Sequence, residues 1–385
     1  MTDLLKLRPT YVLLVFVLCT LSTLNGQEPG NIDQESRISI LFIGDIMGHD
    51  TQIASAENRE THTYDYNDVF KYIKPVLSDA DVAIANLEVT LAGPPYKGYP
   101  QFSSPAALAV ACSNAGIDYF ALANNHSADR GRAGIISTIN KLDSLQIPHT
   151  GSYLNKASRD SLSPLIIKAK GFSLALLNYT YGTNGIRVPK PVIVDSLDKE
   201  QVKKDILKAK KMNPDAVILF LHWGTEYDTV PAINQTALAE ELITAGADLI
   251  IGSHPHVIQK MVWEKNPAGK DSFTVYSLGN FISNQRKPKT DGGSLVRIEL
   301  VKKDGQVKID NAGYFLTWVY TPIEDLRTRF YILPCSEFEN KPSFFEKESD
   351  YDMMMKFIKE SRNLLNSQNV NIEEFENSRM QLFDI

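Results

Sequence analysis

The 385-residue chain has few cysteines and no excess of basic side chains. Its 3 cysteines are too few for a disulfide framework, and Cys112 lies in an apolar run where it is expected to be a small core residue. With 40 basic against 46 acidic side chains, the formal net charge is −6, which argues against a nucleic-acid partner. The chain also lacks internal repeats and low-complexity tracts. Its composition is therefore that of a globular protein.

The N-terminus has the pattern of an export signal. Lys6 and Arg8 precede the apolar run 11–24, which ends at Asn25-Gly26. This order of charged, apolar and small residues is typical of a secretory signal peptide, predicted to span residues 1–26. The run is shorter than the roughly 20 residues that cross a bilayer, so a permanent anchor is the less favoured alternative. We expect an exported protein in the periplasm or associated with the cell envelope.

Apolar segments that predict strands alternate with segments that predict helices. The pattern favours βαβ units and mainly parallel sheets. Residues 165–178 predict an added antiparallel hairpin, and residues after 257 predict further strands of a second sheet. The predicted strands are 37–44, 82–87, 118–122, 215–221 and 247–251, and the predicted helices are 67–77, 105–115, 133–145 and 234–245. We expect one domain over 38–325 and a charged helical C-terminal extension over 326–385.

Polar side chains follow the ends of these strands. In an open α/β sheet the carboxyl ends of parallel strands share one edge, so such side chains can converge. Two carboxylates, an amide and several imidazoles suit Zn, Mn or Fe better than Ca or Mg, and they are numerous enough for two ions. The alternatives are loop or core histidines, and carboxylates that cap helices. The candidates are Asp45, Glu88, Asn125, His126, His222, His254 and His256.

Six short motifs carry a resemblance to a known family. They are Gly-Asp-Ile-Met-Gly at 44, Asn-Leu-Glu at 86, Ala-Asn-Asn-His at 123, His-Trp-Gly at 222, Gly-Ser-His-Pro-His at 252 and Ser-Leu-Gly-Asn-Phe at 277. Together they resemble the CapA family of bacterial capsule and poly-γ-glutamate biosynthesis proteins, within the calcineurin-like metallophosphatases. This resemblance implies an α/β fold, a four-layer α-β-β-α sandwich of two mixed sheets.

The resemblance also implies roles for the candidates. Asp45, Glu88 and His256 would hold a first metal, and Asn125, His222 and His254 a second, with Glu88 bridging. His126 would act as general acid. The chain departs from the metallophosphatase pattern at Met47, where a histidine is usual, and at Asn86-Leu87-Glu88, where Gly-Asp is usual. His49 could supply the missing first-site ligand, or could instead contact substrate or solvent.

The motif set therefore predicts a metal-dependent, phosphoesterase-like hydrolase with two divalent transition-metal ions. Its expected substrate is an anionic polymer or a phosphoester of capsule biosynthesis. The alternatives are a non-catalytic polymer-binding or assembly subunit of an envelope biosynthesis complex, and a hydrolase of γ-glutamyl amides. Four neighbours of the motifs are expected to be structural, with a place beside the site as the alternative: Phe102, Tyr181, Trp223 and Asn280.

Overall fold

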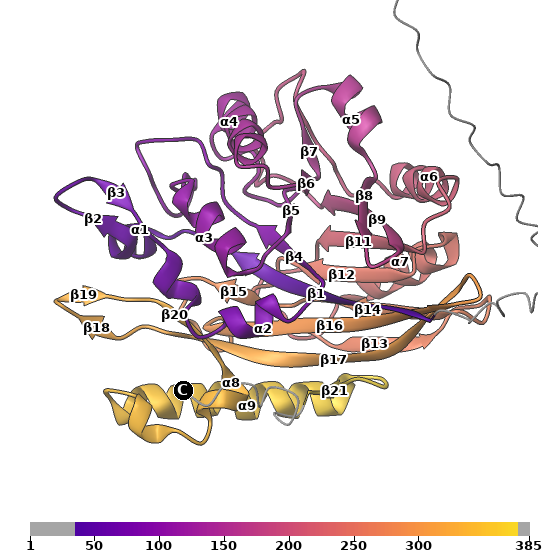
Figure 1. The fold of residues 1–385 in the computed structure, drawn as a ribbon. Helices are drawn as coiled ribbons and strands as arrows, with labels where there is room; N and C mark the ends of the chain where they lie inside the picture. The colour runs from indigo at the N-terminus through magenta and orange to yellow at the C-terminus, as the bar shows by residue number, and fades with distance from the viewer. Residues whose placement is uncertain (1–34, 376–385) are drawn as a thin grey trace, which may run out of the picture. The chain divides into compact units, whose positions relative to one another are not determined.

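The first of two large sheets contains the N-terminal strands (Figure 1). The computed structural model describes residues 35–375, so the predicted signal peptide lies outside the described residues. Within 35–375, this sheet has nine strands in the order β20-β17-β16-β1-β4-β5-β6, with β15 beside β1 and β21 beside β17. Their bounds are β1 Ser36–Ile46, β4 Val82–Leu87, β5 Tyr119–Ala121, β6 His149–Thr150, β15 Asn280–Ile282, β16 Gly292–Lys303, β17 Gln306–Tyr320, β20 Tyr331–Pro334 and β21 Glu373–Glu374.

The second sheet, in the same described residues, has six strands in the order β13-β14-β12-β11-β9-β8. Four strands, β9, β11, β12 and β14, run parallel, and β8 and β13 add antiparallel edges. The predicted hairpin at 165–178 is confirmed as β8 and β9. The bounds are β8 Leu165–Ala169, β9 Phe172–Thr180, β11 Ala216–His222, β12 Leu249–Ser253, β13 Met261–Lys265 and β14 Asp271–Val275.

Three buried clusters define four layers. Side chains such as Phe42 and Ile84 of the first sheet pack against Ile218 and Ile251 of the second. Helices α2 and α3 cover the outer face of the first sheet, and α6 and α7 cover the outer face of the second. The expected α-β-β-α sandwich of mixed sheets is confirmed. The bounds of these four helices, and of α4 and α9, are α2 Lys74–Ser78, α3 Ala107–Ala115, α4 Gly131–Ser144, α6 Lys199–Lys210, α7 Ile233–Ala245 and α9 Glu348–Gln368.

Shorter elements fill the connections between these layers. Figure 1 shows the β18–β19 hairpin extending from the end of β17, and α9 running alongside β16 and β17. These elements are α1 Asp50–Ala56, β2 Glu57–Asn58, β3 Thr63–Tyr64, η1 Asn67–Phe70, β7 Ser152–Tyr153, α5 Lys156–Leu162, β10 Ile193–Val194, β18 Ile323–Glu324, β19 Arg327–Thr328, α8 Cys335–Phe338 and η2 Pro342–Phe344. In the described part of the chain, every helix is too short or too polar to cross a membrane.

The expected helix over 67–77 is wrong as one element. The chain forms the short η1 and then α2, with Pro75 in the first turn of α2. Proline has no N–H to donate, and its ring would clash with the preceding turn of a continuous helix. The boundary at residue 325 stays a prediction. The described residues beyond it include β20 and β21, which both pair with β17.

A bulge in β1 sets the direction of its last residues. The register with β4 shifts between Ile43 and Asp45, so that Asp45 lies opposite Asn86. Gly44 permits this because a Cβ there would lie 2.1 Å from the Gly279 carbonyl oxygen. A bulge redirects the side chains that follow it. Asp45 is thereby buried at the carboxyl end of the strand.

Candidate metal centre

The six predicted ligands meet between the carboxyl ends of the two sheets. The first sheet supplies one half of the set, from the end of β1 and the loops after β4 and β5, and the second supplies the other, from the end of β11 and the loop after β12. All are buried, with at most 3% of any residue exposed: Asp45, Glu88, Asn125, His222, His254 and His256. Parallel strands from both sheets therefore end at one place, as the sequence predicts.

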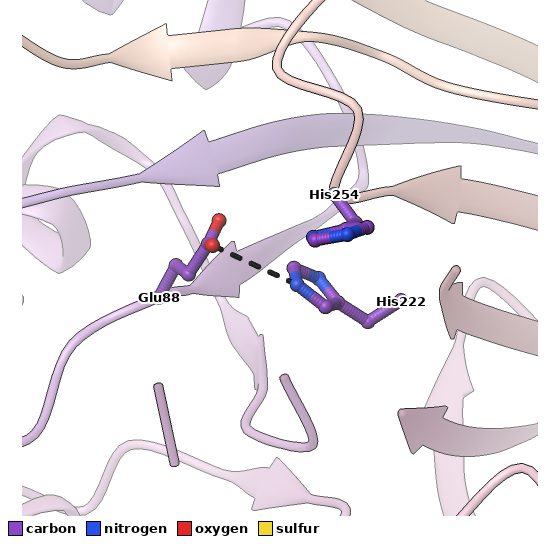
Figure 2. A group of neighbouring side chains, drawn as sticks. All are labelled: Glu88, His222 and His254. Carbon is purple, nitrogen blue, oxygen red and sulfur yellow. Dashed lines mark ion pairs between the residues drawn. The ribbon is translucent and has the colours of Figure 1, made fainter. Parts of the chain in front are cut away.

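The first group of ligand atoms belongs to Glu88, His222 and His254 (Figure 2). One donor atom from each residue lies within 4.8 Å of the other two. The Glu88 Oε1 atom is 3.6 Å from Nε2 of His222. That same nitrogen is 3.0 Å from the Asn125 Oδ1 atom, so the amide oxygen extends this group. A carboxylate, two imidazoles and an amide oxygen thus face one small volume.

The second group contains Asp45, Glu88 and His256, again with donor atoms within 4.8 Å of one another. Nδ1 of His256 lies 3.1 Å from Asp45 Oδ2 and 3.1 Å from Asn280 Oδ1. Because both neighbours are acceptors, Nδ1 carries the hydrogen. Nε2 is then left as the basic nitrogen, 3.9 Å from Glu88 Oε1. Glu88 is common to both groups.

Several buried ligand atoms in these groups have no hydrogen-bond partner among the described residues. They include Oε1 of Glu88 and Nδ1 of His254. An unpaired buried polar atom costs free energy unless a ligand satisfies it, and neutral imidazoles with carboxylates are suitable ligands for divalent cations. The side chains present therefore fit divalent metal ions.

Burial also shifts the protonation of these ligands. Loss of hydration raises the pKa of Glu88 well above its ordinary value, and the neighbouring Asp45 adds to the shift. Burial lowers the pKa of His222, and it lowers that of His254 to about 3, with nearby histidines contributing in both cases. Both imidazoles are consequently neutral near pH 7, which is the form that binds a metal.

The loop that carries His254 and His256 has a strained backbone. Their φ angles are 102° and 58°, in the left-handed region that bulky side chains rarely adopt. Each such residue costs about 1–3 kcal/mol, so the surrounding fold must hold it there. Gly252, just before the pair, lies so close to the Tyr276 carbonyl that an added Cβ would be 2.0 Å from its oxygen. The histidines are presented by a tightly packed loop.

His126 lies outside both ligand groups and pairs with a carboxylate that the sequence analysis missed. Its Nδ1 is 2.8 Å from Asp129 Oδ2, and both residues are buried. The same carboxylate oxygen accepts the Phe102 N–H at 2.6 Å, and the Phe102 ring meets the His126 ring edge-on. Nδ1–H therefore points at Asp129, which leaves Nε2 as the nitrogen that can transfer a proton. The sequence signal available for this pair was that Asp129 follows His126 by three positions.

Asn86 was also missed as a partner of the ligands. In the sequence it is recognisable only as a departure from the family pattern. Its Nδ2 donates to Asp45 Oδ1 at 2.8 Å and lies 3.4 Å from Glu88 Oε2. The amide thus separates two carboxylates that would otherwise repel each other. It also fixes which oxygens remain free for a ligand.

His49 and Met47 show how the first motif differs from the family pattern. Met47 is buried in the cluster beneath the first sheet and provides no ligand there. His49 belongs to neither ligand group and precedes α1. Its Nδ1 accepts the Asn284 N–H at 3.2 Å, and burial lowers its pKa to about 4. His49 is therefore a neutral imidazole held by the Asn284 backbone, outside both groups.

Three of the four neighbouring residues have structural roles. The Trp223 indole donates to the Tyr276 carbonyl at 3.0 Å, and Phe102 is fully buried against His126. Asn280 orients His256 through its Oδ1. Tyr181 differs because it is 49% exposed while its ring lies 4.5 Å from that of His254.

Comparison with known proteins identifies the chain's relatives. "Capsule biosynthesis protein CapA" of Bacillus anthracis is 30% identical over 278 residues, which cover 69% of this chain and 65% of that protein. The chain thus spans just under two thirds of that relative. "PGA biosynthesis protein CapA" of Bacillus subtilis (strain 168) is 29% identical over 279 residues, covering 70% of this chain and 69% of that protein.

Solved structures and a family model complete the comparison. NAD nucleotidase of Haemophilus influenzae has a TM-score of 0.47 at 14% identity, covering 86% of this chain and 68% of that one. Calcineurin-like phosphoesterase YfkN of Bacillus subtilis has a TM-score of 0.44 at 13% identity, covering 86% and 99%. The family model of the bacterial capsule synthesis protein PGA_cap matches residues 39–285. The chain therefore belongs to the bacterial capsule synthesis protein family PGA_cap.

Proposed function

We propose that the chain is an exported protein of capsule biosynthesis that hydrolyses a phosphoester at a centre of two divalent metal ions. The observation that carries this proposal is the sharing of Glu88 by two groups of buried ligands, Asp45–His256 on one side and His222–His254 on the other. A shared carboxylate is what two adjacent ions require. The names of the two Bacillus relatives, for capsule and PGA biosynthesis, support the cellular role.

Different side chains would hold each of the two ions. Two adjacent Mn, Fe or Zn ions would supply activation of water and stabilisation of charge on a phosphoryl oxygen. His222, His254 and the Asn125 oxygen would hold one ion, and Asp45 and His256 the other, with Glu88 between them.

His126 would transfer the proton in this reaction. With Nδ1–H directed at Asp129, its Nε2 can donate a proton to the leaving oxygen, and Asp129 stabilises the charged imidazolium. The proton would pass from Nε2 to the leaving oxygen as its bond to phosphorus breaks, while a water oxygen forms the new bond to phosphorus.

The test is metal content per chain, measured by elemental mass spectrometry on the purified protein. We expect two ions in the unaltered chain, one in His222→Asn, one in His256→Asn and none in Glu88→Gln, because only Glu88 belongs to both groups. His62→Asn is the control, since the His62 side chain is 79% exposed and is a member of neither group. No bound ion after reconstitution with Mn, Fe and Zn would contradict the proposal.

A non-catalytic role is the second candidate. Met47 is buried in the core at the position where the family pattern has a histidine ligand. This favours weakened metal binding at Asp45 and His256, in a polymer-binding or assembly subunit of an envelope complex. Phosphodiester and γ-glutamyl amide substrates should be compared with the metal-loaded protein. Phosphodiester turnover that His126→Ala abolishes would support the proposed function. Turnover of the amide alone would assign the same centre to a γ-glutamyl hydrolase, and no turnover would favour the subunit.

A further inference from the structure

Tyr181 lies over one side of the candidate metal centre with half of its surface in solvent. It directly follows β9, and its N–H donates to the His222 carbonyl at 2.9 Å. Its ring centroid is 4.5 Å from that of His254, and 49% of the residue is exposed. Tyr181 therefore covers a buried histidine with one face while it leaves much of its remaining surface free.

Tyr227 has the equivalent position beside the other histidine of the loop. Its ring is 6.3 Å from that of His256, and it is 39% exposed. The N–H of Tyr227 donates to the Pro255 carbonyl at 2.8 Å, between the two histidines. The Lys287 ammonium lies 4.0 Å from the centre of the Tyr227 ring. Two half-exposed tyrosines thus flank a pair of histidines whose ring centroids are 6.0 Å apart.

The fold holds Tyr227 in an unfavourable conformation. Its φ angle is 71°, in the left-handed region where a bulky side chain is an outlier. Such strain persists only where surrounding contacts impose it, and it is concentrated at functional sites. Here the buried Gln259 donates to the Asp228 carbonyl at 2.7 Å, and Gln235 donates to Gln259 at 3.2 Å. Buried amides therefore fix the loop that presents Tyr227.

Glu226 and Lys287 place charge beside Tyr227. Glu226 directly precedes Tyr227 in the chain and is exposed. Burial raises the pKa of the Tyr227 hydroxyl to about 12, and the Glu226 carboxylate adds to the shift. This hydroxyl therefore remains a protonated donor at neutral pH. The two tyrosines, Glu226 and Lys287 form one surface beside the centre, which we term the tyrosine platform.

We propose that the tyrosine platform binds a ring of the substrate, so that the substrate is a phosphoester whose leaving group carries a sugar or a nucleoside. This inference rests on the proposed phosphoesterase function. Exposed aromatic faces bind flat or ring-shaped groups through large contact areas, while hydroxyl and carboxylate groups at their edges bind the polar substituents. Because the Lys287 ammonium lies over the Tyr227 ring, Tyr181 offers the larger exposed aromatic surface. A linear γ-glutamyl chain has no ring face, and its carboxylates would meet the charge of Glu226. The chemistry of the platform therefore favours a ring-bearing phosphoester.

Calorimetric titration of the metal-loaded protein tests this proposal. The probes are a glycosyl phosphonate, a nucleoside phosphonate and a linear hydroxyalkyl phosphonate, which share the anionic group and resist hydrolysis. We expect one ring compound to bind at least about tenfold more tightly than the linear one, as base–aromatic stacking does elsewhere. Whichever ring binds more tightly identifies the sugar or the nucleoside as the leaving group.

Variants separate ring binding from general damage to the site. Tyr181→Ala and Tyr227→Ala should each raise the Kd of the ring compound about tenfold and leave that of the linear compound unchanged, whereas Tyr181→Phe should retain ring binding. Leu326→Ala, at a 98% exposed position in the β18–β19 hairpin, is the control for loss of a surface apolar side chain. Equal affinity for ring and linear compounds, or equal weakening of both in the alanine variants, would overturn the proposal.

The same titration with a neutral methyl glycoside and a neutral nucleoside distinguishes the two proposals, because these probes carry no group for a metal. Suppose that either neutral probe binds, that Tyr181→Ala weakens this binding, and that the protein hydrolyses no phosphoester. This result would support the tyrosine platform and contradict the proposed function. Phosphoester hydrolysis without preference for rings would preserve the function and overturn the platform.

Discussion

The burial of His254 predicts how the stability of the metal-free protein depends on pH. Burial lowers its folded-state pKa to about 3, whereas an unfolded histidine has a pKa of about 6.5. Between these values the unfolded chain binds a proton at His254 that the folded chain does not. The contribution of this residue to the free energy of unfolding therefore falls as the pH is lowered below about 6.5.

The expected magnitude follows from the two pKa values. Each pH unit within this window corresponds to about 1.4 kcal/mol for one group. Between pH 7.5 and pH 5.5 only the lower unit lies inside the window, so His254 should account for about 1.4 kcal/mol of lost stability. His254→Asn keeps a polar side chain of similar size and does not titrate. The variant should lack this part of the pH dependence.

The assay is urea unfolding of the metal-free protein at both pH values, with a chelator present. Trp223 is 2% exposed and stacks on Tyr276, so its fluorescence should report the loss of tertiary structure. The difference between the unaltered chain and His254→Asn should change by about 1.4 kcal/mol from pH 7.5 to pH 5.5. An unchanged difference would refute the reasoning, because it would mean that burial does not keep His254 neutral in the folded state.

Three further predictions concern other parts of the site. Glu88→Gln should stabilise the metal-free protein increasingly as the pH rises above about 4.3. Because the folded-state pKa of Glu88 is raised, the unaltered chain loses up to about 1.4 kcal/mol of unfolding free energy per pH unit through that window, and the variant does not. Equal slopes of unfolding free energy against pH for the two proteins, measured by urea unfolding, would contradict this. Asp129→Asn should lower turnover about 10²-fold or more while metal content is unchanged, since Asp129 contacts His126 and lies outside the ligand groups; loss of bound metal would instead show a structural role. Gly252→Ala should lower the thermal midpoint by several degrees, because its Cβ would lie 2.0 Å from the Tyr276 carbonyl oxygen; a wild-type midpoint would show that the strands can separate without cost.

Much of the site could be predicted because its signals are local. Each ligand follows an apolar run that predicts a buried strand, and parallel strands bring their carboxyl ends together. Asp45, Glu88 and His222 could therefore be placed from their strands alone. The individual strands also follow from local patterns, since buried parallel strands are continuous apolar runs and the hairpin turns at Lys170-Gly171. The division of strands between the sheets does not follow from them. The strands β16 and β17 were expected in a second sheet with the others after residue 257, but they join β1 in the first sheet.

The contacts that orient the ligands were harder to predict because they depend on packing. Asn86 reaches Asp45 only through the shifted register of β1 and β4, which no sequence period reveals. Tyr227 is presented by a left-handed backbone, in a loop without a strand or helix pattern. The position of His49 is set by the Asn284 N–H, from a segment 235 residues later in the chain. Such long-range contacts follow from how the two sheets meet.

The division of the ligands between the two sheets has a consequence for the whole core. Each ligand group joins Glu88 of the first sheet to at least one histidine of the second, so an ion bound there would cross-link the sheets. A shift of one sheet over the other by a fraction of an ångström would change every metal–ligand distance. Side chains that would never contact such an ion, for example Ile84 and Ile218 between the sheets, would therefore help to determine metal affinity. Selection for that affinity would restrict the shapes allowed in the core.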